Sequence, residues 1–286
     1  MKITNVPKKR SHKGLIILLV IVAVIAALLL DSRYRIVVTS YELSYDNLPE
    51  SFDGYRVVQL SDLHMADYGE KLIDKVRAQQ PDIIVMTGDF MNMNSPETES
   101  GQAERLRPTL EALVAVAPCY FVSGNHEWAS GEMTALSALL SELGIKYLKN
   151  EFVLLERGGE SIVLAGVEDP NGPADMIRPN ELAERIRTDY PDKYVLLLAH
   201  RNDLLVKYPN LVVNTVLCGH AHGGIVRLPF AGGVFGTDAT LFPKYDAGIF
   251  NEGSYDMVLS RGLGGYTRMP RFLNNPEVVT VILKKS

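Results

Sequence analysis

Short apolar runs rich in β-branched residues alternate with stretches of helical periodicity in the first half of this chain. The runs are YRVVQL (55–60), DIIVMT (82–87) and CYFVS (119–123). The helical faces that follow them in turn are Leu72, Ile73 and Val76, then Leu106, Leu110, Leu113, Val114 and Ala117, and then Met133, Leu136, Leu139, Leu140 and Leu143. The runs indicate strands and the spacing of the other positions indicates helices. This βαβαβα order favours a layered α/β domain.

Strand patterns dominate the second half of the chain. EFVLLE (151–156) and SIVLAG (161–166) lie on either side of Gly158 and Gly159, which predicts a hairpin. YVLLLA, LVVNTVL, DMVLS and EVVTVIL follow, and only residues 181–189 show a clear helical pattern there. Two sheets accommodate this many strands better than one.

An apolar segment, GLIILLVIVAVIAALLL (14–30), contains no charged side chain and follows a basic head. At ~1.5 Å per residue, a helix of this length spans about 25 Å, close to the hydrocarbon thickness of a bilayer. A cleaved signal peptide and a buried core helix are the alternatives, but the segment ends in LLLDSRYR without a convincing cleavage site. We therefore expect an uncleaved transmembrane signal anchor.

Basic residues are concentrated before the apolar segment, so the positive-inside tendency places the N-terminus in the cytoplasm. The predicted organisation is a basic cytoplasmic head (1–13), the anchor (14–30), a connector (31–54) and a single folded domain (55–286). We expect a single-pass protein of the cell membrane whose main domain is extracytoplasmic.

Composition and missing motifs exclude several classes of function. The net charge is −5 and no long basic run occurs beyond the head, so no nucleic-acid partner is expected. The two cysteines, Cys119 and Cys218, lie in apolar runs and are expected to be buried free thiols. The sequence has no GxGxxG, GxxxxGK[ST] or GxSxG motif, which excludes a P-loop and a serine hydrolase.

Five of the six histidines lie within a few residues of a predicted strand end. They are His64 in SDLH, His126 in GNHE, His200 in LLLAH, and His220 and His222 in GHAH. The sixth, His12, lies in the basic head and is expected to be solvated. Because loops at the carboxyl ends of strands share one edge of a rigid sheet, the five histidines are expected to converge.

Asp62, Asp89 and Asn125 lie in the same loops as these histidines. Alone, each is most simply a capping or turn residue. The ordered combination of DxH, GD, GNH, a strand-end His and GHxH instead favours one shared site. Carboxylate, amide and imidazole ligands without thiolate suit divalent ions such as manganese, iron, zinc or cobalt.

The sequence resembles the calcineurin-like metallophosphoesterase family in five ordered blocks, namely SDLH (61–64), TGDF (87–90), SGNHE (123–127), LAH (198–200) and GHAHGG (219–224). The ending SRGLGGYTRMPRFLNNPEVVTVIL is similar to the bacterial membrane-anchored branch of that family. The resemblance implies a β-sandwich of two mixed sheets flanked by helices, preceded here by one transmembrane helix. This architecture agrees with the strand-rich second half.

The resemblance also implies a role for each site residue. Two divalent ions per chain, of manganese, iron, zinc or cobalt, would be held by two ligand sets: Asp62, His64, Asp89 and His222, and Asp89, Asn125, His200 and His220. Asp89 would bridge both ions, because its two oxygens can bind two cations and offset their repulsion. His126 is not a ligand in this family and is placed near the leaving group, as a general acid or charge stabiliser.

The spacing of His220 and His222 suggests how one short segment could serve both ions. On an extended segment, alternate residues point the same way while Ala221 points away, so the two histidines could reach different ions. Gly223 and Gly224 permit turns and close backbone approach. As a phosphate cradle they lack the strand, loop and helix context of a nucleotide fingerprint.

Two positions depart from the family pattern. Asn92 stands where many members carry a second Asp, and Arg201 follows His200 where members often have a proline nearby. Neither departure removes a ligand, but the second concerns the loop on the substrate side. Gly264 and Gly265 in RGLGGYTR are as readily a turn as a binding loop.

The expected reaction is hydrolysis of a phosphodiester or pyrophosphate bond by a hydroxide that bridges the two ions, with His126 relieving charge on the leaving oxygen. A domain tethered to a bilayer meets its substrates at the membrane surface. The expected partner is therefore a phosphate ester that is membrane-associated, lipid-linked or part of the cell envelope. The alternatives are a non-catalytic, metal-stabilised binding scaffold on the membrane and a phosphomonoesterase.

Overall fold

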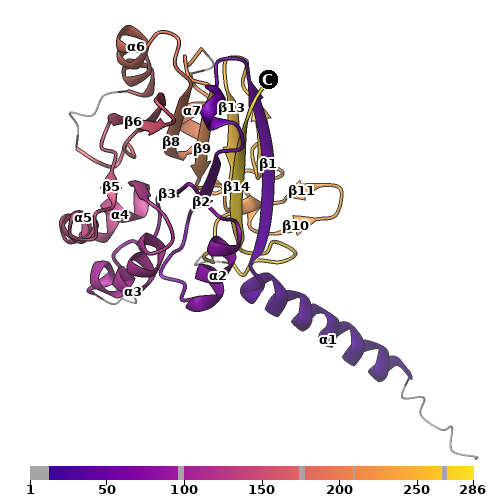
Figure 1. The fold of residues 1–286 in the computed structure, drawn as a ribbon. Helices are drawn as coiled ribbons and strands as arrows, with labels where there is room; N and C mark the ends of the chain where they lie inside the picture. The colour runs from indigo at the N-terminus through magenta and orange to yellow at the C-terminus, as the bar shows by residue number, and fades with distance from the viewer. Residues whose placement is uncertain (1–12, 96–99, 174–177, 209, 266–268) are drawn as a thin grey trace, which may run out of the picture.

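The computed structural model of the protein describes residues 13–95, 100–173, 178–208, 210–265 and 269–286 (Figure 1). His12 and the rest of the basic head before Lys13 lie outside these residues.

Two six-stranded sheets form the body. The first has the order β1 (Val37–Tyr45), β14 (Glu277–Lys285), β2 (Arg56–Leu60), β3 (Ile83–Thr87), β4 (Cys119–Val122) and β5 (Lys146–Tyr147). The second has the order β12 (Gly248–Asn251), β13 (Asp256–Leu259), β9 (Thr215–Gly219), β8 (Val195–Arg201), β7 (Glu160–Gly166) and β6 (Glu151–Arg157).

Both sheets combine parallel and antiparallel neighbours. In the first, β2, β3 and β4 are parallel while β14 and β2 are antiparallel. In the second, β7, β8, β9 and β13 are parallel while β6 and β12 run antiparallel at the edges. The expected pair of mixed sheets and the β6–β7 hairpin are therefore confirmed.

Alternate residues of the central strands face different layers. In β3, Ile83 and Val85 pack between the two sheets, whereas Ile84 and Met86 pack against the helices outside. Strands buried on both faces read as continuous apolar runs, which explains the pattern of DIIVMT. Cys119 and Cys218 are buried free thiols, as expected.

Helices cover the outer faces of the sandwich. The first sheet is covered by α2 (Glu70–Ala78), α3 (Gln102–Val114) and α5 (Met133–Glu142), and the second by α6 (Pro179–Asp189) and α7 (Asn202–Leu205). The predicted apolar faces are buried except for Val114 and Leu143, which are half-buried against the same core. Ala117 and Leu143 lie beyond the ends of their helices. The short elements are η1 (Glu50–Phe52), α4 (Asn125–Ser130), η2 (His222–Gly224), β10 (Arg227–Leu228) and β11 (Gly232–Gly233).

The range 31–54, expected to be a connector, contains a strand of the first sheet. β1 pairs in parallel with β14 over nine residues, from Val37 opposite Glu277 to Tyr45 opposite Lys285. Leu43 of β1 is buried between the two sheets. The segment before residue 55 therefore contributes an edge strand to the domain.

The apolar segment forms the helix α1 (Lys13–Tyr34), which extends away from the domain (Figure 1). Within the described residues, it is the one helix long and apolar enough to cross a membrane. Its last turn is fastened to the domain, because Asn275 Nδ2 donates hydrogen bonds to the carbonyl oxygen of Asp31 at 2.8 Å and to its Oδ2 at 3.0 Å. Ser32 is buried at this junction.

Candidate metal centre

The carboxyl ends of five strands from both sheets bring every predicted site residue together. Asp62 and His64 follow β2, Asp89 follows β3, Asn125 and His126 begin α4 after β4, His200 lies near the end of β8, and His220 and His222 follow β9. These strands are parallel within each sheet, so their ends meet at one edge of the sandwich. The predicted convergence of the five histidines is what the fold produces.

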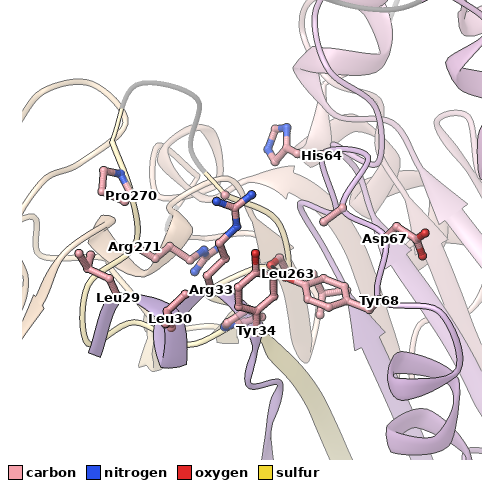
Figure 2. A pocket seen from close by; sticks show the side chains of 13 residues that line it. Leu29, Leu30, Arg33, Tyr34, His64, Asp67, Tyr68, Leu263, Pro270 and Arg271 are labelled. Atoms are coloured by element: carbon pink, nitrogen blue, oxygen red, sulfur yellow. Dashed lines mark hydrogen bonds between the residues drawn. The ribbon is translucent and has the colours of Figure 1, made fainter. Parts of the chain in front are cut away.

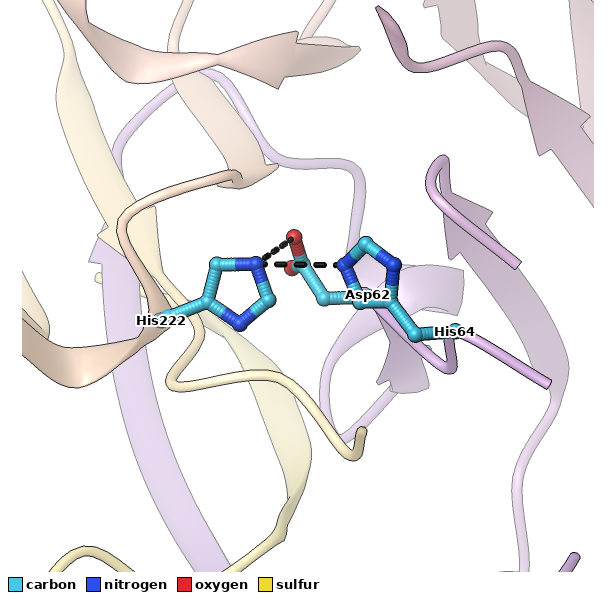
Figure 3. Close-up of side chains that lie close together, drawn as sticks. All are labelled: Asp62, His64 and His222. Carbon is cyan, nitrogen blue, oxygen red and sulfur yellow. Dashed lines mark hydrogen bonds and ion pairs between the residues drawn. The ribbon is translucent and has the colours of Figure 1, made fainter. Parts of the chain in front are cut away.

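Asp62, His64 and His222 form the first group of metal-ligand side chains, with ligand atoms all within 4.8 Å of one another (Figure 3). The Nε2 atoms of His64 and His222 lie 3.2 Å apart, and His222 Nε2 lies 3.4 Å from Asp62 Oδ1. Burial lowers the pKa of His64 to about 4 and holds the pKa of His222 well below its usual value. Both rings are therefore neutral near pH 7 and keep a lone pair for a cation.

Asp89, His200 and His220 form the second group, again within 4.8 Å. His200 Nε2 lies 3.1 Å from Asp89 Oδ2 and 3.2 Å from both His220 Nδ1 and Asn125 Oδ1. Asn125 thus joins this group. Burial lowers the pKa of His220 to about 3, which keeps its ring neutral as well.

The donor set fits divalent cations. His200 Nδ1 bonds the carbonyl oxygen of Thr87 at 2.8 Å, which fixes the ring and aims Nε2 at a carboxylate oxygen and an amide oxygen. Lone pairs that face one another at such distances require positive charge between them. Without a bound ion, a proton on His200 supplies this positive charge. Burial lowers the pKa of His200, but the carboxylates of Asp89 and Asp62 outweigh burial and raise the pKa to about 10. A bound cation meets the same need.

Asp89 lies between the two groups. Its Oδ2 is 3.1 Å from His200 Nε2 and 3.8 Å from His64 Nε2. The carboxylate is almost fully buried, and its Oδ1 accepts the backbone N–H of His126 at 2.8 Å. No other carboxylate in the described residues contributes to groups on both sides of the centre, which is the position of a bridging ligand.

The histidines after β9 reach the two groups by a route that differs from the expectation. The predicted extended segment is wrong, because β9 ends at Gly219 and His220 and His222 have φ of 71° and 50°. Left-handed conformations cost energy for residues other than glycine, so packing must hold the turn in place. Asp62 Oδ1 accepts the backbone N–H of His220 at 3.1 Å, and Asn274 Nδ2 donates to the carbonyl oxygen of His222 at 2.8 Å. These bonds, with the buried Ala221 between them, hold the turn that sends the two histidines to different groups.

Glu127 organises the site, although sequence reasoning gave it no role. This buried carboxylate accepts four backbone N–H groups: from Asp89 at 2.8 Å, Phe90 at 2.6 Å, Met91 at 3.1 Å and Gly124 at 2.7 Å. It thereby joins the loop that carries Asp89 to the loop that carries Asn125 and His126. The signal was the Glu at the third position of α4, where a side chain reaches back to the helix start.

His126 lies beside both groups with a defined orientation, and with His64 and Asp89 it forms a third set of possible metal ligands within 4.8 Å of one another. Its Nδ1 accepts the backbone N–H of Met93 at 3.1 Å, so a neutral ring carries its proton on Nε2. That Nε2 lies 3.8 Å from Asp89 Oδ2, and burial lowers the pKa of the ring below its usual value. Its side chain is 14% exposed, against 5% for His64 and 0% for His200, so His126 is the histidine most open to an incoming molecule among these three.

Glycine is required where the two central loops touch. A Cβ on Gly88, whose φ is 84°, would lie 2.5 Å from the backbone nitrogen of Gly124, and a Cβ on Gly124 would collide with Asp89 Oδ1. Gly224 packs against the backbone of Gly233, so it serves close packing in a turn. Of the departures from the family pattern, Asn92 belongs to neither ligand group, and Arg201 is held by Asp169 through Nε at 2.6 Å.

Two cavities open beside the metal centre, one next to each group of ligand side chains. The larger, of 620 Å³, reaches His64 of the first group and the last turn of α1 (Figure 2). The smaller, of 420 Å³, reaches His220 of the second group and is lined by charged residues that include Arg201, Asp238 and Lys244. Gly265 lines the larger cavity, while a Cβ on Gly264 would collide with the carbonyl oxygen of Leu63.

Comparisons with known proteins agree with the chemistry of this centre. The family model for calcineurin-like phosphoesterases matches residues 55–224, more than half of the chain. The uncharacterized metallophosphoesterase YkuE of Bacillus subtilis is 29% identical over 265 residues, covering 88% of this chain and 87% of that protein. The UDP-2,3-diacylglucosamine pyrophosphatase LpxG of Chlamydia trachomatis is 28% identical over 285 residues, covering 81% and 85%.

A third relative combines this domain with a membrane protein. The transmembrane protein with metallophosphoesterase domain of Danio rerio is 27% identical over 299 residues, covering 96% of this chain and 64% of that protein. The family match includes all eight predicted site residues, from Asp62 to His222. The chain therefore belongs to the calcineurin-like phosphoesterase family, whose members are generally dinuclear metal enzymes, and it is a metal-dependent phosphoric ester hydrolase.

Proposed function

We propose that this protein hydrolyses a phosphodiester or pyrophosphate bond in a lipid-linked substrate of the membrane or cell envelope. The observation that carries the proposal is the pairing of two groups of imidazoles and carboxylates across one carboxylate, Asp89. Such a pair of groups matches the two-ion arrangement used in phosphoryl hydrolysis.

The ligand sets follow from the two groups. Asp62, His64, Asp89 and His222 would hold one ion, and Asp89, Asn125, His200 and His220 the other. When bound, the two ions supply positive charge to the phosphoryl oxygens and lower the pKa of water towards neutrality. Glu127 holds the loops of Asp89 and Asn125 in register, so the two sets keep their spacing.

His126 stabilises the leaving oxygen in this proposal. Its Nδ1 is occupied by the backbone N–H of Met93, which leaves the Nε2–H to face the centre. A hydrogen bond donated by Nε2–H stabilises the negative charge that develops on the leaving oxygen. The ring stays neutral throughout, and the departing alkoxide or phosphate takes its proton from water.

The membrane setting supports a lipid-linked substrate. The helix α1 has the length and composition of a membrane span, and it ends within hydrogen-bonding distance of the domain. LpxG, one of the relatives, is named for a pyrophosphatase that acts on a diacylated sugar nucleotide. The basic head before α1 favours an N-terminus in the cytoplasm and hence an extracytoplasmic catalytic domain.

The test uses the full chain, because β1 begins at Val37 and a fragment trimmed further would lose part of the first sheet. Purified protein is stripped of metal, reloaded with Mn²⁺, and assayed on bis-p-nitrophenyl phosphate and p-nitrophenyl phosphate beside Asp89→Asn. We expect metal-dependent cleavage of the diester that is lost in the variant. The bound manganese per chain is measured on the same samples.

Other results would change the proposal. Two tightly bound ions without turnover of either compound would favour the non-catalytic scaffold. Turnover of p-nitrophenyl phosphate alone would indicate a phosphomonoesterase. Digestion of intact cells with an added protease checks the side of the membrane, because only an extracytoplasmic domain is cleaved.

A further inference from the structure

The larger cavity lies between the candidate metal centre and the end of helix α1. Its walls include His64, a predicted metal ligand, and Leu29, Leu30, Arg33 and Tyr34, which form the end of the anchor helix (Figure 2). At 620 Å³, the cavity is large enough for a substantial part of a small-molecule ligand. The end of the anchor is therefore part of the surroundings of the metal centre.

The position of this cavity relative to a bilayer follows from the length of α1. Its 22 residues rise about 33 Å, so Arg33 and Tyr34 lie where the hydrocarbon ends and the headgroups begin. Tyr and Arg are typical of that boundary. The bonds between Asn275 and Asp31 hold the end of the helix against the domain, which keeps the mouth of the cavity at the boundary.

Arg271 gives the cavity an unsatisfied positive group. Its side chain lines the cavity and is only 5% exposed. Nε donates to the carbonyl oxygen of Gly264 and Nη2 to that of Arg261, each at 2.7 Å, while Nη1 has no hydrogen-bond partner within the described part of the chain. A buried cationic N–H group without an acceptor lowers the stability of the fold, and a bound anion would remove this cost by accepting the hydrogen bond. A guanidinium is well suited to phosphate oxygens.

We propose that this cavity binds a phosphate ester with an acyl or alkyl chain that enters from the bilayer. The chain packs against Leu30 and Tyr34 of α1, and an anionic phosphate oxygen accepts from Arg271. The proposal rests on the proposed function, and it makes α1 one wall of the substrate site as well as a tether. Leu30 and Tyr34 are 59% and 56% exposed, so they have apolar surface available for such a chain.

The test compares two esters that share a chromogenic leaving group, methyl p-nitrophenyl phosphate and dodecyl p-nitrophenyl phosphate. The full chain is reconstituted in phosphatidylcholine nanodiscs and loaded with Mn²⁺. For the wild type we expect kcat/KM to favour the dodecyl ester. In the double variant Leu30→Ala, Tyr34→Ala, the dodecyl-to-methyl ratio of kcat/KM should fall about tenfold, since apolar burial at two side chains is lost.

The control is Val24→Ala, a change at an exposed position of α1 outside the lining of the cavity, which should keep the wild-type ratio. Arg271→Lys tests the phosphate contact: KM should rise about tenfold for both esters, with kcat and bound manganese retained. A purely structural role of Arg271 would instead lower kcat, bound metal or the melting temperature.

The outcomes separate this inference from the proposed function. If the wild type cleaves neither ester, the proposed function and this inference both fail. If the wild type cleaves both esters and the double variant keeps the wild-type ratio, the cavity does not bind the chain and this inference alone is overturned. A normal KM in Arg271→Lys would overturn the phosphate contact.

Discussion

The two cavities beside the metal centre differ in what surrounds them. The larger one, at His64, is walled partly by the end of α1, and three leucines lie in its lining beside the charged side chains of Arg33, Asp67 and Arg271. The smaller one, at His220, is lined by side chains of both charges. A molecule bound across Asp89 thus meets leucine side chains on the side of the larger cavity, whereas no leucine among the described residues lines the smaller one. The two groups of ligand side chains contain similar residue types. The two ends of a bound substrate are therefore distinguished by the linings of the two cavities and not by the ligands.

Asp89→Asn should disrupt both groups of ligand side chains at once. An amide cannot neutralise two cations, so we expect at least about 10³-fold loss of kcat/KM and loss of paired metal. Activity on bis-p-nitrophenyl phosphate and metal content by atomic spectroscopy measure the two effects. Retention of two ions with normal turnover would show that Asp89 does not join the groups.

His126→Asn should separate chemistry from metal binding. We expect kcat to fall by about 10²- to 10³-fold, because the leaving oxygen loses a hydrogen-bond donor, while two ions per chain are retained. The defect should be smaller for esters with a more acidic leaving group, whose departing oxygen carries less charge. An equal defect for acidic and basic leaving groups would contradict a hydrogen bond from His126 to the leaving oxygen.

Glu127→Gln should loosen both groups together, since Glu127 joins the loop of Asp89 to that of Asn125. A Gln side chain presents N–H groups where backbone N–H groups already converge. We expect metal affinity to fall about 10- to 100-fold, as measured by titration of Mn²⁺. The matched control is Glu111→Gln on the exposed face of α3, and a similar loss there would mean that the titration reports a general effect.

Lys244→Ala should have the smallest effect and sharpens the comparison of the cavities. Lys244 lines the smaller cavity, but its side chain is 73% exposed, so solvent screens its attraction for an anionic substrate. We expect about a twofold decrease of kcat/KM for a diester with an anionic headgroup at low salt, and no decrease at high salt. The ratio between dodecyl and methyl esters should not change, and a changed ratio would show that the two cavities are not independent.

Much of the site could be predicted because its chemistry is carried by residue type and order. Asp62, Asp89 and His200 lie at strand ends that periodicity identifies, and strands of parallel sheets bring those ends to one edge. The mixed sandwich could be expected for the same reason, together with the resemblance to the family. The assigned roles of the individual ligands stay predictions until metal binding is measured.

The rest depended on long-range packing that no local pattern contains. β1 pairs with β14, more than two hundred positions away, so the β-branched run IVVT at 36–39 could not show which sheet its strand joins. The left-handed turn at His220 and His222 is held by contacts with Asp62 and Asn274, which lie far away in the sequence. Glu127 was visible in the motif, but its four backbone partners belong to two loops that meet only in the fold.

The pairing of β1 with β14 has a consequence for biogenesis. β1 leaves the ribosome soon after α1, yet the strand that it adjoins is made last, and β14 also separates β1 from β2. During synthesis the edge of β2 that later accepts β14 stays open, so the first sheet cannot close until the end of the chain has been made. Shortening the chain by the length of β14 should therefore leave a species that is inserted in the bilayer but is readily degraded by proteases.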